Sequence, residues 1–194
     1  MFDGSGQAPW QEGAPTGPLS VYGRTKLDGE LAIQASGASA VVLRTSWVYA
    51  ARGHNFAKTM LRLAAERDAL NVVADQFGAP TGADLIADVT AHILHRIFSV
   101  QDARPLAGTY HLAAAGETSW HGYAQFVLAH ASHNGVALRV SAEQVGAINT
   151  EAYPVPAPRP RNSRLALAKL EETFNLKMPL WQQGVQRMLD EIQR

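Results

Sequence analysis

A tyrosine and a lysine spaced four residues apart could together carry out the reduction of a carbonyl group. Tyr22 and Lys26 lie in residues 21–35, where Leu27 and Leu31 predict a helix with one inner face. Residues at positions i and i+4 share a helix face, so the phenol and the ammonium can point into one cleft. A tyrosine hydroxyl can donate a proton to a carbonyl oxygen as hydride reaches the carbon, and a nearby cation favours the phenolate.

The spacing of this pair is weak support when taken by itself. The chain has five tyrosines and four lysines among 194 residues, so roughly 0.1 such pairs are expected by chance. The alternative interpretation is a surface helix with an ordinary tyrosine and a solvated lysine. The elements around the pair therefore decide between the two.

Helical and strand patterns alternate along almost the whole chain. Helices are predicted over residues 21–35, 55–66, 83–98, 119–132, 165–174 and 181–192, and strands over residues 40–45, 70–74, 109–113 and 137–140. Ser119 is a candidate N-cap. The strand at residues 40–45 is nearly all apolar, as expected of a strand buried on both faces. The alternation predicts an α/β fold with a largely parallel sheet and a smaller lobe.

The composition excludes several classes of protein. The formal net charge is zero, which does not favour nucleic acid or an anionic membrane as a partner. The absence of cysteine excludes disulfides and cysteine-ligated metals. No apolar run approaches the roughly 20 residues of a membrane span, and no signal peptide is visible. We expect a cytoplasmic protein. The Gly- and Pro-rich residues 1–18 resemble the interior of a longer sequence, which predicts a fragment.

Five short strings occur in an order that is specific, although each string alone is not. They are PLSVYGRTKLDGE at residues 18–30, VVLRTSWVY at 41–49, DQFGAPT at 75–81, GTYHL at 108–112 and RPRNS at 159–163. Taken together they resemble the dTDP-4-dehydrorhamnose reductases, a subgroup of the extended short-chain dehydrogenase/reductases. The resemblance covers essentially the whole chain.

The resemblance implies a fold, a reaction and a catalytic pair. Residues 1–75 would be the carboxyl-terminal part of a Rossmann NAD(P)-binding domain, and residues 76–194 mainly a lobe that binds the nucleotide sugar. NADPH, or NADH, would reduce the 4-keto group of dTDP-4-dehydro-L-rhamnose to give dTDP-L-rhamnose, a surface-polysaccharide precursor. Tyr22 would donate the proton, and Lys26 would hold the cofactor ribose and tune Tyr22. The family expectation is a homodimer.

Further site residues follow from the same resemblance. Thr45 would contact the cofactor, and the substrate would be bound by Ser46, Trp47, Asn55, Gln76, Arg159 and Arg161. Trp47 would stack on the sugar, while the two arginines would meet the pyrophosphate. All of these positions except Asn55 also have a plain structural interpretation: a packed aromatic, the end of a strand, a turn at residues 75–78 and solvated charges.

The chain departs from the family pattern at two places. The family opens with a strand, a Gly-rich turn and a helix that receive the cofactor's pyrophosphate. The best local imitation, Gly4-Ser5-Gly6, has no preceding strand, so we expect this polypeptide alone to be inactive. Some members bind Mg²⁺ through carboxylates, and Asp84 stands where a longer Glu is usual. Two alternatives remain: an NAD-dependent nucleotide-sugar epimerase, and a non-catalytic regulatory subunit of the same family.

Overall fold

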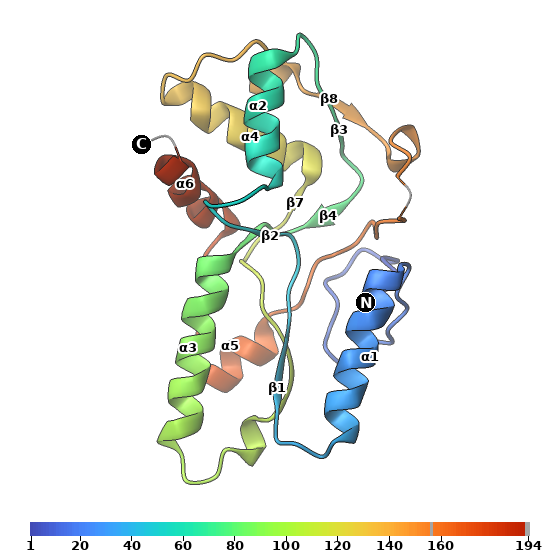
Figure 1. The fold of residues 1–194 in the computed structure, drawn as a ribbon, viewed down its shortest axis with the longest axis vertical. Helices are drawn as coiled ribbons and strands as arrows, with labels where there is room; N and C mark the ends of the chain where they lie inside the picture. The colour runs from blue at the N-terminus through green and yellow to red at the C-terminus, as the bar shows by residue number, and fades with distance from the viewer. Residues whose placement is uncertain (156, 193–194) are drawn as a thin grey trace.

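The computed structural model describes residues 1–155 and 157–192, and Figure 1 shows an elongated molecule with two parts. The lower part holds α1 (Val21–Ala35), β1 (Val41–Arg44), α3 (Ala83–Ser99), β6 (Gly108–His111) and α5 (Ala168–Phe174). The upper part holds α2 (Phe56–Glu66), β3 (Asn71–Val73), α4 (Trp120–His133), β8 (Gly146–Ile148) and α6 (Trp181–Ile192). Segments from both sides of residue 75 thus contribute to each part, and the domain division at that residue stays a prediction.

Short strands lie where the chain crosses between the two parts. They are β2 (Val48–Tyr49), β4 (Phe77–Gly78), β5 (Thr81–Gly82) and β7 (Thr118–Ser119). Three-residue 3-10 helices, η1 (Arg104–Leu106), η2 (Ala142–Gln144) and η3 (Thr150–Ala152), complete the elements of the described residues. We call this crossing region the waist.

The strands pair two by two. β1 with β6, β2 with β5 and β3 with β8 are parallel, while β4 with β7 is antiparallel. The α/β class and the mainly parallel pairing are therefore confirmed. The described residues form four two-stranded ladders, however, where the sequence predicted one sheet. In the β1–β6 ladder the last pair is Arg44 with His111.

Three apolar clusters hold the described residues together. Two of them lie in the upper part and pack α4 against α6 and α2, around Tyr123 and Leu128. The third packs α3 and α5 against β6, around Tyr110 and Phe174, and one side of β1 joins it through Val41 and Leu43. Burial of apolar area in these clusters is the main stabilising contribution.

Helix α1 has the predicted bounds but not the predicted inner face. Its buried residues are Gly23 and Glu30, whereas Leu31 is 52% exposed. β1 is half-buried at every position, so the prediction of a strand buried on both faces is wrong for this structure. The reason is common to both elements: among the described residues β1 has a strand partner only in β6, and no apolar cluster reaches α1.

Two predicted helix starts are confirmed, and one predicted strand is wrong. Asn55 caps α2 by accepting from the backbone N–H of Lys58, and Ser119 caps α4. Residues 137–140 form no strand; the ladder strand in this region is β8. The backbone N–H groups of Arg139 and Val140 instead donate to the carbonyl of Ala64, one of the last carbonyls of α2, which has no partner within its own helix.

The first 17 residues form a loop that packs against residues 160–166. Trp10 forms a parallel bridge with Leu165, and the indole N–H of Trp10 donates to the carbonyl of Asn162. Phe2 is buried and stacks on Trp10 with ring centroids 4.7 Å apart. The described helices include none long and apolar enough to cross a membrane.

Candidate functional site

The first turns of α1 present Tyr22 and Lys26 to solvent. Ser20 caps the helix by accepting from the N–H of Gly23, which fixes where the helix begins. Tyr22 is 72% exposed, and the Lys26 ammonium lies 5.3 Å from the centre of its ring. Within residues 1–155 and 157–192, neither the hydroxyl nor the ammonium has a hydrogen-bond partner, so both are available to a ligand.

This end of α1 lies level with the carboxyl end of β1, since the two elements run in opposite directions (Figure 1). Open α/β sheets bind their ligands at the carboxyl ends of parallel strands. Thr45 and Ser46 follow β1 directly; Thr45 is exposed, and the hydroxyl of Ser46 is buried without a partner in the described chain. The structure thus brings Tyr22, Lys26, Thr45 and Ser46 to one end of the lower part.

Trp47 lies in the waist and has a backbone conformation that residues other than glycine seldom adopt. Its φ is +50°, and its ring stacks on Trp120 with centroids 3.6 Å apart. Gly78 approaches so closely that a Cβ there would lie 2.6 Å from the indole. One face of Trp47 is therefore already covered by Trp120, and stacking on a sugar would need the other face or a movement of the pair.

Asn55 lies at the start of α2, where its side chain is used twice within the protein. Its oxygen accepts from the N–H of Lys58, and its amide nitrogen donates to the carbonyl of Ala50 at 2.6 Å. These contacts make Asn55 the N-cap of α2. A contact with the substrate stays a prediction.

A second polar group lies at the carboxyl ends of the parallel strands β3 and β8. The carboxylate of Asp75 accepts from both the N–H and the hydroxyl of Thr150, and the buried Gln76 amide donates to the same hydroxyl at 3.2 Å. Arg161 pairs with Glu151 and with Asp75. Arg159 is exposed nearby in sequence. Among the described residues no hydrogen bond or ring contact joins this group to Tyr22 or Lys26.

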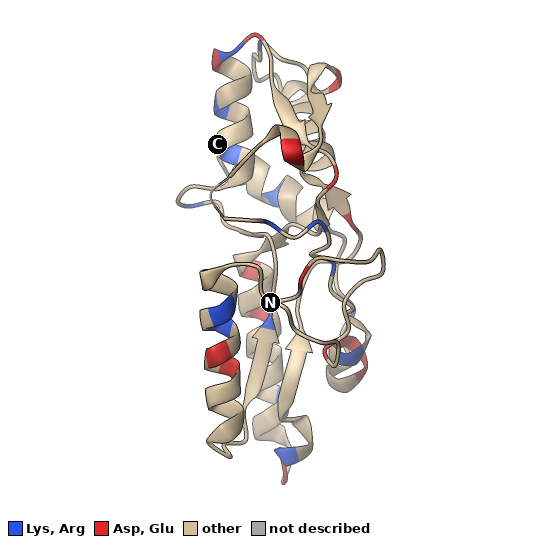
Figure 2. Ribbon diagram, turned by 90° about the vertical axis from the view of Figure 1, so that its right-hand side faces the viewer, with Lys and Arg blue, Asp and Glu red and all other residues tan. Residues whose placement is uncertain are grey.

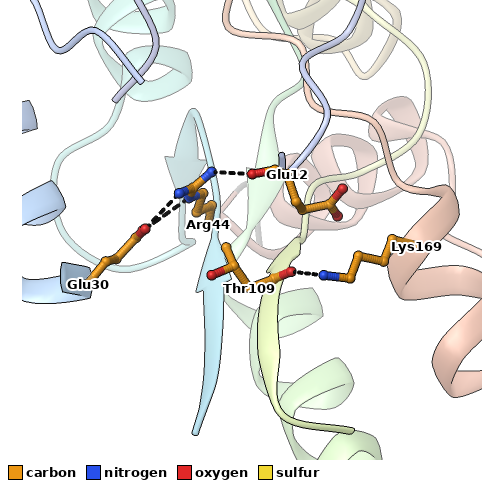
Figure 3. A network of polar contacts seen from close by, with 5 residues as sticks. All are labelled: Glu12, Glu30, Arg44, Thr109 and Lys169. Carbon is orange, nitrogen blue, oxygen red and sulfur yellow. Dashed lines mark hydrogen bonds and ion pairs between the residues drawn. The ribbon is translucent and has the colours of Figure 1, made fainter. Parts of the chain in front are cut away.

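Sequence reasoning missed a buried polar network between α1, which carries Tyr22 and Lys26, and β1. Arg44 donates to both carboxylate oxygens of Glu30 and to the backbone carbonyl of Glu12, as Figure 3 shows. The carboxylate of Glu12 accepts from the backbone N–H of His111. Beside it, Lys169 donates to the carbonyl of Thr109.

Two signals in the sequence could have pointed to this network. Glu30 follows Lys26 by four residues, just as Lys26 follows Tyr22, so all three recur at a helical spacing. Arg44 is the single charged residue in the strand predicted at residues 40–45. A charged side chain that is buried in a strand needs a partner.

Arg164 was also missed, although it is more enclosed than either predicted arginine. Its side chain is 14% exposed, pairs with Glu117 and lies over the ring of Phe77 at 5.5 Å. Its guanidinium also donates to the side-chain oxygen of Asn162, which is itself buried. A run of polar residues in a Pro-rich loop gives no sign of which arginine will be enclosed.

The described residues give no support to a metal at Asp84. Its carboxylate pairs with Arg187 and accepts from the N–H of Leu85. No group of three His, Cys, Asp or Glu within the described ranges could hold a metal ion. Burial, and then the charge of Asp84, raise the pKa of the neighbouring Tyr49, whose ring lies among the residues of a cavity of about 350 Å³.

The residues at Gly4-Ser5-Gly6 serve packing and form no phosphate-binding turn. A Cβ at Gly4 would lie 2.4 Å from Pro160, and the carbonyl of Gly4 accepts from the N–H of Asn162. The first element of the described residues is α1, so no helix directly follows Gly6. In the ribbon of Figure 2, basic and acidic residues are interspersed along both parts.

Comparison with known proteins places these features in one family. The sequence model described as the RmlD substrate binding domain matches residues 1–194. The chain is 51% identical to the dTDP-4-dehydrorhamnose reductase of Escherichia coli K12 and 50% identical to that of Salmonella typhimurium LT2. Each match covers 99% of this chain and 62% of the relative. The chain therefore spans less than two thirds of the length of these relatives.

A solved structure agrees with the sequence comparison. The crystal structure of dTDP-4-dehydrorhamnose reductase from Bacillus anthracis, in complex with NADP, superposes with a TM-score of 0.80 at 32% identity. The match covers 98% of this chain and 62% of that one. Fold and sequence thus agree over nearly every residue, and the chain belongs to the RmlD substrate-binding domain family.

Proposed function

We propose that this chain is the substrate-binding and proton-donating portion of an NADPH-dependent dTDP-4-dehydrorhamnose reductase. The observation that carries the proposal is the pair Tyr22 and Lys26, exposed and without polar partners in the described chain, beside the carboxyl end of β1. The names of relatives about 50% identical support the same reaction. The NADP in the Bacillus anthracis structure supports the cofactor.

The residues of this chain suit one end of that cofactor. Lys26 has three N–H donors and no competing carboxylate in the described structure, which suits the hydroxyls of the nicotinamide ribose. Thr45 is exposed at the adjacent strand end. Bound NADPH supplies the hydride. The described residues offer no Gly-rich cradle for the pyrophosphate, so this part of the cofactor needs residues of another segment.

The exposed hydroxyl of Tyr22 can act as the proton donor. As the carbonyl carbon of the sugar gains hydride, its oxygen gains negative charge, and the Tyr22 hydroxyl donates its proton to that oxygen. The product is the alcohol, and the phenolate left behind is stabilised by the Lys26 ammonium until a proton returns from solvent. The ketone thus gains one hydride from NADPH and one proton from Tyr22.

The remaining substrate contacts belong to the waist and the second polar group. Trp47 offers an aromatic face for the sugar, with Ser46 beside it. Gln76, Arg159 and Arg161 would meet the nucleotide end, where a guanidinium suits phosphate oxygens. Arg161 must then exchange Glu151 for the pyrophosphate, since both compete for the same N–H groups.

The test is turnover in a chimeric reductase in which residues 1–194 replace the matching segment of the Escherichia coli relative. We expect NADPH oxidation with dTDP-4-dehydro-L-rhamnose, a loss of about 100-fold or more in Tyr22→Phe, and little change in Tyr110→Phe. Tyr110 is a matched control because its hydroxyl donates to the carbonyl of Leu106, away from the site. Residues 1–194 alone should give no turnover.

Two results would overturn the proposal. Interconversion of sugar epimers without net NADPH oxidation would favour an epimerase. A chimera that binds cofactor and sugar but turns over neither would favour the regulatory-subunit alternative.

A further inference from the structure

Helix α1, which carries Tyr22 and Lys26, has little apolar packing within the described residues. None of the three apolar clusters contains a residue of Val21–Ala35 in the described structure. Val21, Leu31 and Ile33 are instead 75%, 52% and 42% exposed. A catalytic group must be held within a fraction of an ångström of its working position. Some other contact has to supply that precision.

That contact is a buried ion pair at Glu30. The Arg44 guanidinium meets the Glu30 carboxylate through three N–O contacts of 2.8, 3.1 and 3.2 Å, and the two side chains are 10% and 9% exposed. A two-point pair of this kind fixes direction as well as distance, because the planar fork of Arg matches a carboxylate in one orientation. Figure 3 shows the pair bridging α1 and β1.

Arg44 is itself held on the sheet side. It is the last residue of β1 in the ladder with β6, opposite His111. Its remaining guanidinium nitrogen, Nη1, donates to the carbonyl of Glu12 at 3.2 Å, and the carboxylate of Glu12 accepts from the N–H of His111 at 3.0 Å. Glu30 is therefore tied through Arg44 to both strands of the ladder that ends at the proposed site.

The helix geometry passes this anchoring on to the catalytic pair. Glu30 lies four residues after Lys26 and eight after Tyr22, which at 1.5 Å per residue is about 6 Å and about 12 Å along the axis. The other buried residue of α1 is Gly23, beside Pro18 in the first turn. The helix is thus held at two points, and without Glu30 it can pivot about its first turn and re-aim both side chains.

We infer that the Glu30–Arg44 ion pair positions α1, and with it Tyr22 and Lys26, against the carboxyl end of the β1–β6 ladder. Glu30 and Arg44 are positioning residues: they act through the helix and touch neither substrate nor cofactor. The link to catalysis rests on the proposed function, while the anchoring of α1 can be measured without any activity.

The test compares Glu30→Gln with Glu30→Asp and with Glu66→Gln. Glu30→Gln removes the charge at nearly constant shape, and Glu30→Asp keeps the charge on a shorter side chain. Glu66→Gln breaks a matched ion pair with Arg62 on α2 that is 56% and 60% exposed. Amide hydrogen exchange is measured on residues 1–194 and on the chimeric reductase, and kcat and KM are measured on the chimera.

We expect Glu30→Gln to raise exchange at least 10-fold across α1 and to leave α4 unchanged. In the chimera kcat should fall at least 10-fold, with a much smaller change in KM for the sugar, whose proposed contacts lie largely elsewhere. Glu30→Asp should recover part of both losses, and Glu66→Gln should change neither. A double variant, Glu30→Leu with Arg44→Leu, covers the case in which a lone buried charge prevents folding; it should restore protection of α1.

Each other outcome has a defined meaning. Unchanged exchange in α1 overturns the anchoring. Exchange raised equally in α1 and α4 makes the pair a general stabiliser and also overturns the inference. Raised exchange in α1 with normal kcat breaks the link to Tyr22. If the parent chimera shows no turnover, the proposed function fails, and exchange alone decides whether the pair anchors α1.

Discussion

The helices of the upper part and helix α1 of the lower part are stabilised by different kinds of contact. In the upper part, α4 lies between α2 and α6 and buries Tyr123, Val127 and Leu128 almost completely. In the lower part, α3 and α5 share one apolar cluster with β6, but α1 lies outside it. Its buried contacts are a glycine and an ion pair.

The difference suggests how the two proposed roles divide. Regions with few buried apolar contacts open at low free energy, whereas packed helices open only with the whole domain. By this criterion the upper part, which holds the second polar group, should open less readily than α1. The helix proposed to donate the proton depends on polar contacts, and its exposed apolar side chains leave room for more protein against it.

The largest expected difference is between two leucine substitutions, one in α4 and one in α1. Leu128→Ala in α4 removes a side chain with no exposed surface, and we expect a loss of about 2–5 kcal/mol in the free energy of unfolding. Leu31→Ala in α1 should change it by less than about 0.5 kcal/mol, because that side chain is half exposed. Urea unfolding measures both. Equal losses would mean that α1 is packed as firmly as α4.

The next prediction concerns local opening of α1. Arg44→Met leaves the Glu30 carboxylate buried without its partner, which favours release of the helix and exposes the peptide bonds after Arg24 and Lys26 to trypsin. Cleavage there should accelerate on the order of 100-fold, because proteolysis follows the population of the open form. Arg62→Met, which breaks the exposed pair on α2, is the control. Similar cleavage in both variants would contradict the comparison.

Substitutions of two glycines should change the free energy of unfolding in opposite directions. Gly78→Ala places a Cβ 2.6 Å from the Trp47 indole, so it should cost about 1–3 kcal/mol and alter tryptophan fluorescence as the Trp47–Trp120 stack shifts. Gly29→Ala in α1 meets no atom within 4 Å and should stabilise the helix by about 0.5–1 kcal/mol. Thermal unfolding followed by fluorescence measures both. A stable Gly78→Ala variant with unchanged fluorescence would show that Trp47 is loosely placed.

The smallest effect is a pH dependence in the lower part. Burial, opposed by the Glu12 carboxylate and reinforced by Arg44, lowers the pKa of His111. The unfolded chain, with a histidine pKa of about 6.5, then takes up the proton first. The stabilisation is fully present above about pH 6.5 and is lost as the pH falls from there toward the folded pKa. The urea concentration at the midpoint of unfolding should decrease as the pH is lowered from 7.5 to 5.5. His111→Asn should reduce this decrease, whereas His95→Asn, at an exposed position, should not.

Much of the fold and part of the site could be predicted from sequence. Local signals sufficed for the bounds of α1, the start of α2, the cap at Ser119, and the pairing of Tyr22 with Lys26. The predicted strand at residues 137–140 failed because its apolar pattern reports burial, and Val140 is buried beside the end of α2 without any ladder. The helical spacing of Glu30 and the lone charge of Arg44 indicate that each needs a partner, but no local pattern identifies which residue 14 positions away it is.

The tie between the opening loop and residues 160–166 has a consequence for how the chain is made. Trp10 and Asn162 are 152 positions apart, and contacts that close so long a loop carry a large entropic cost and form late in folding. Synthesis delivers the amino-terminal residues first, at about 5–20 residues per second. Phe2 and Trp10 therefore emerge from the ribosome many seconds before the segment that covers them. We expect these two aromatic side chains to stay uncovered until residues 160–166 have been made, and so to be a point of capture for a chaperone.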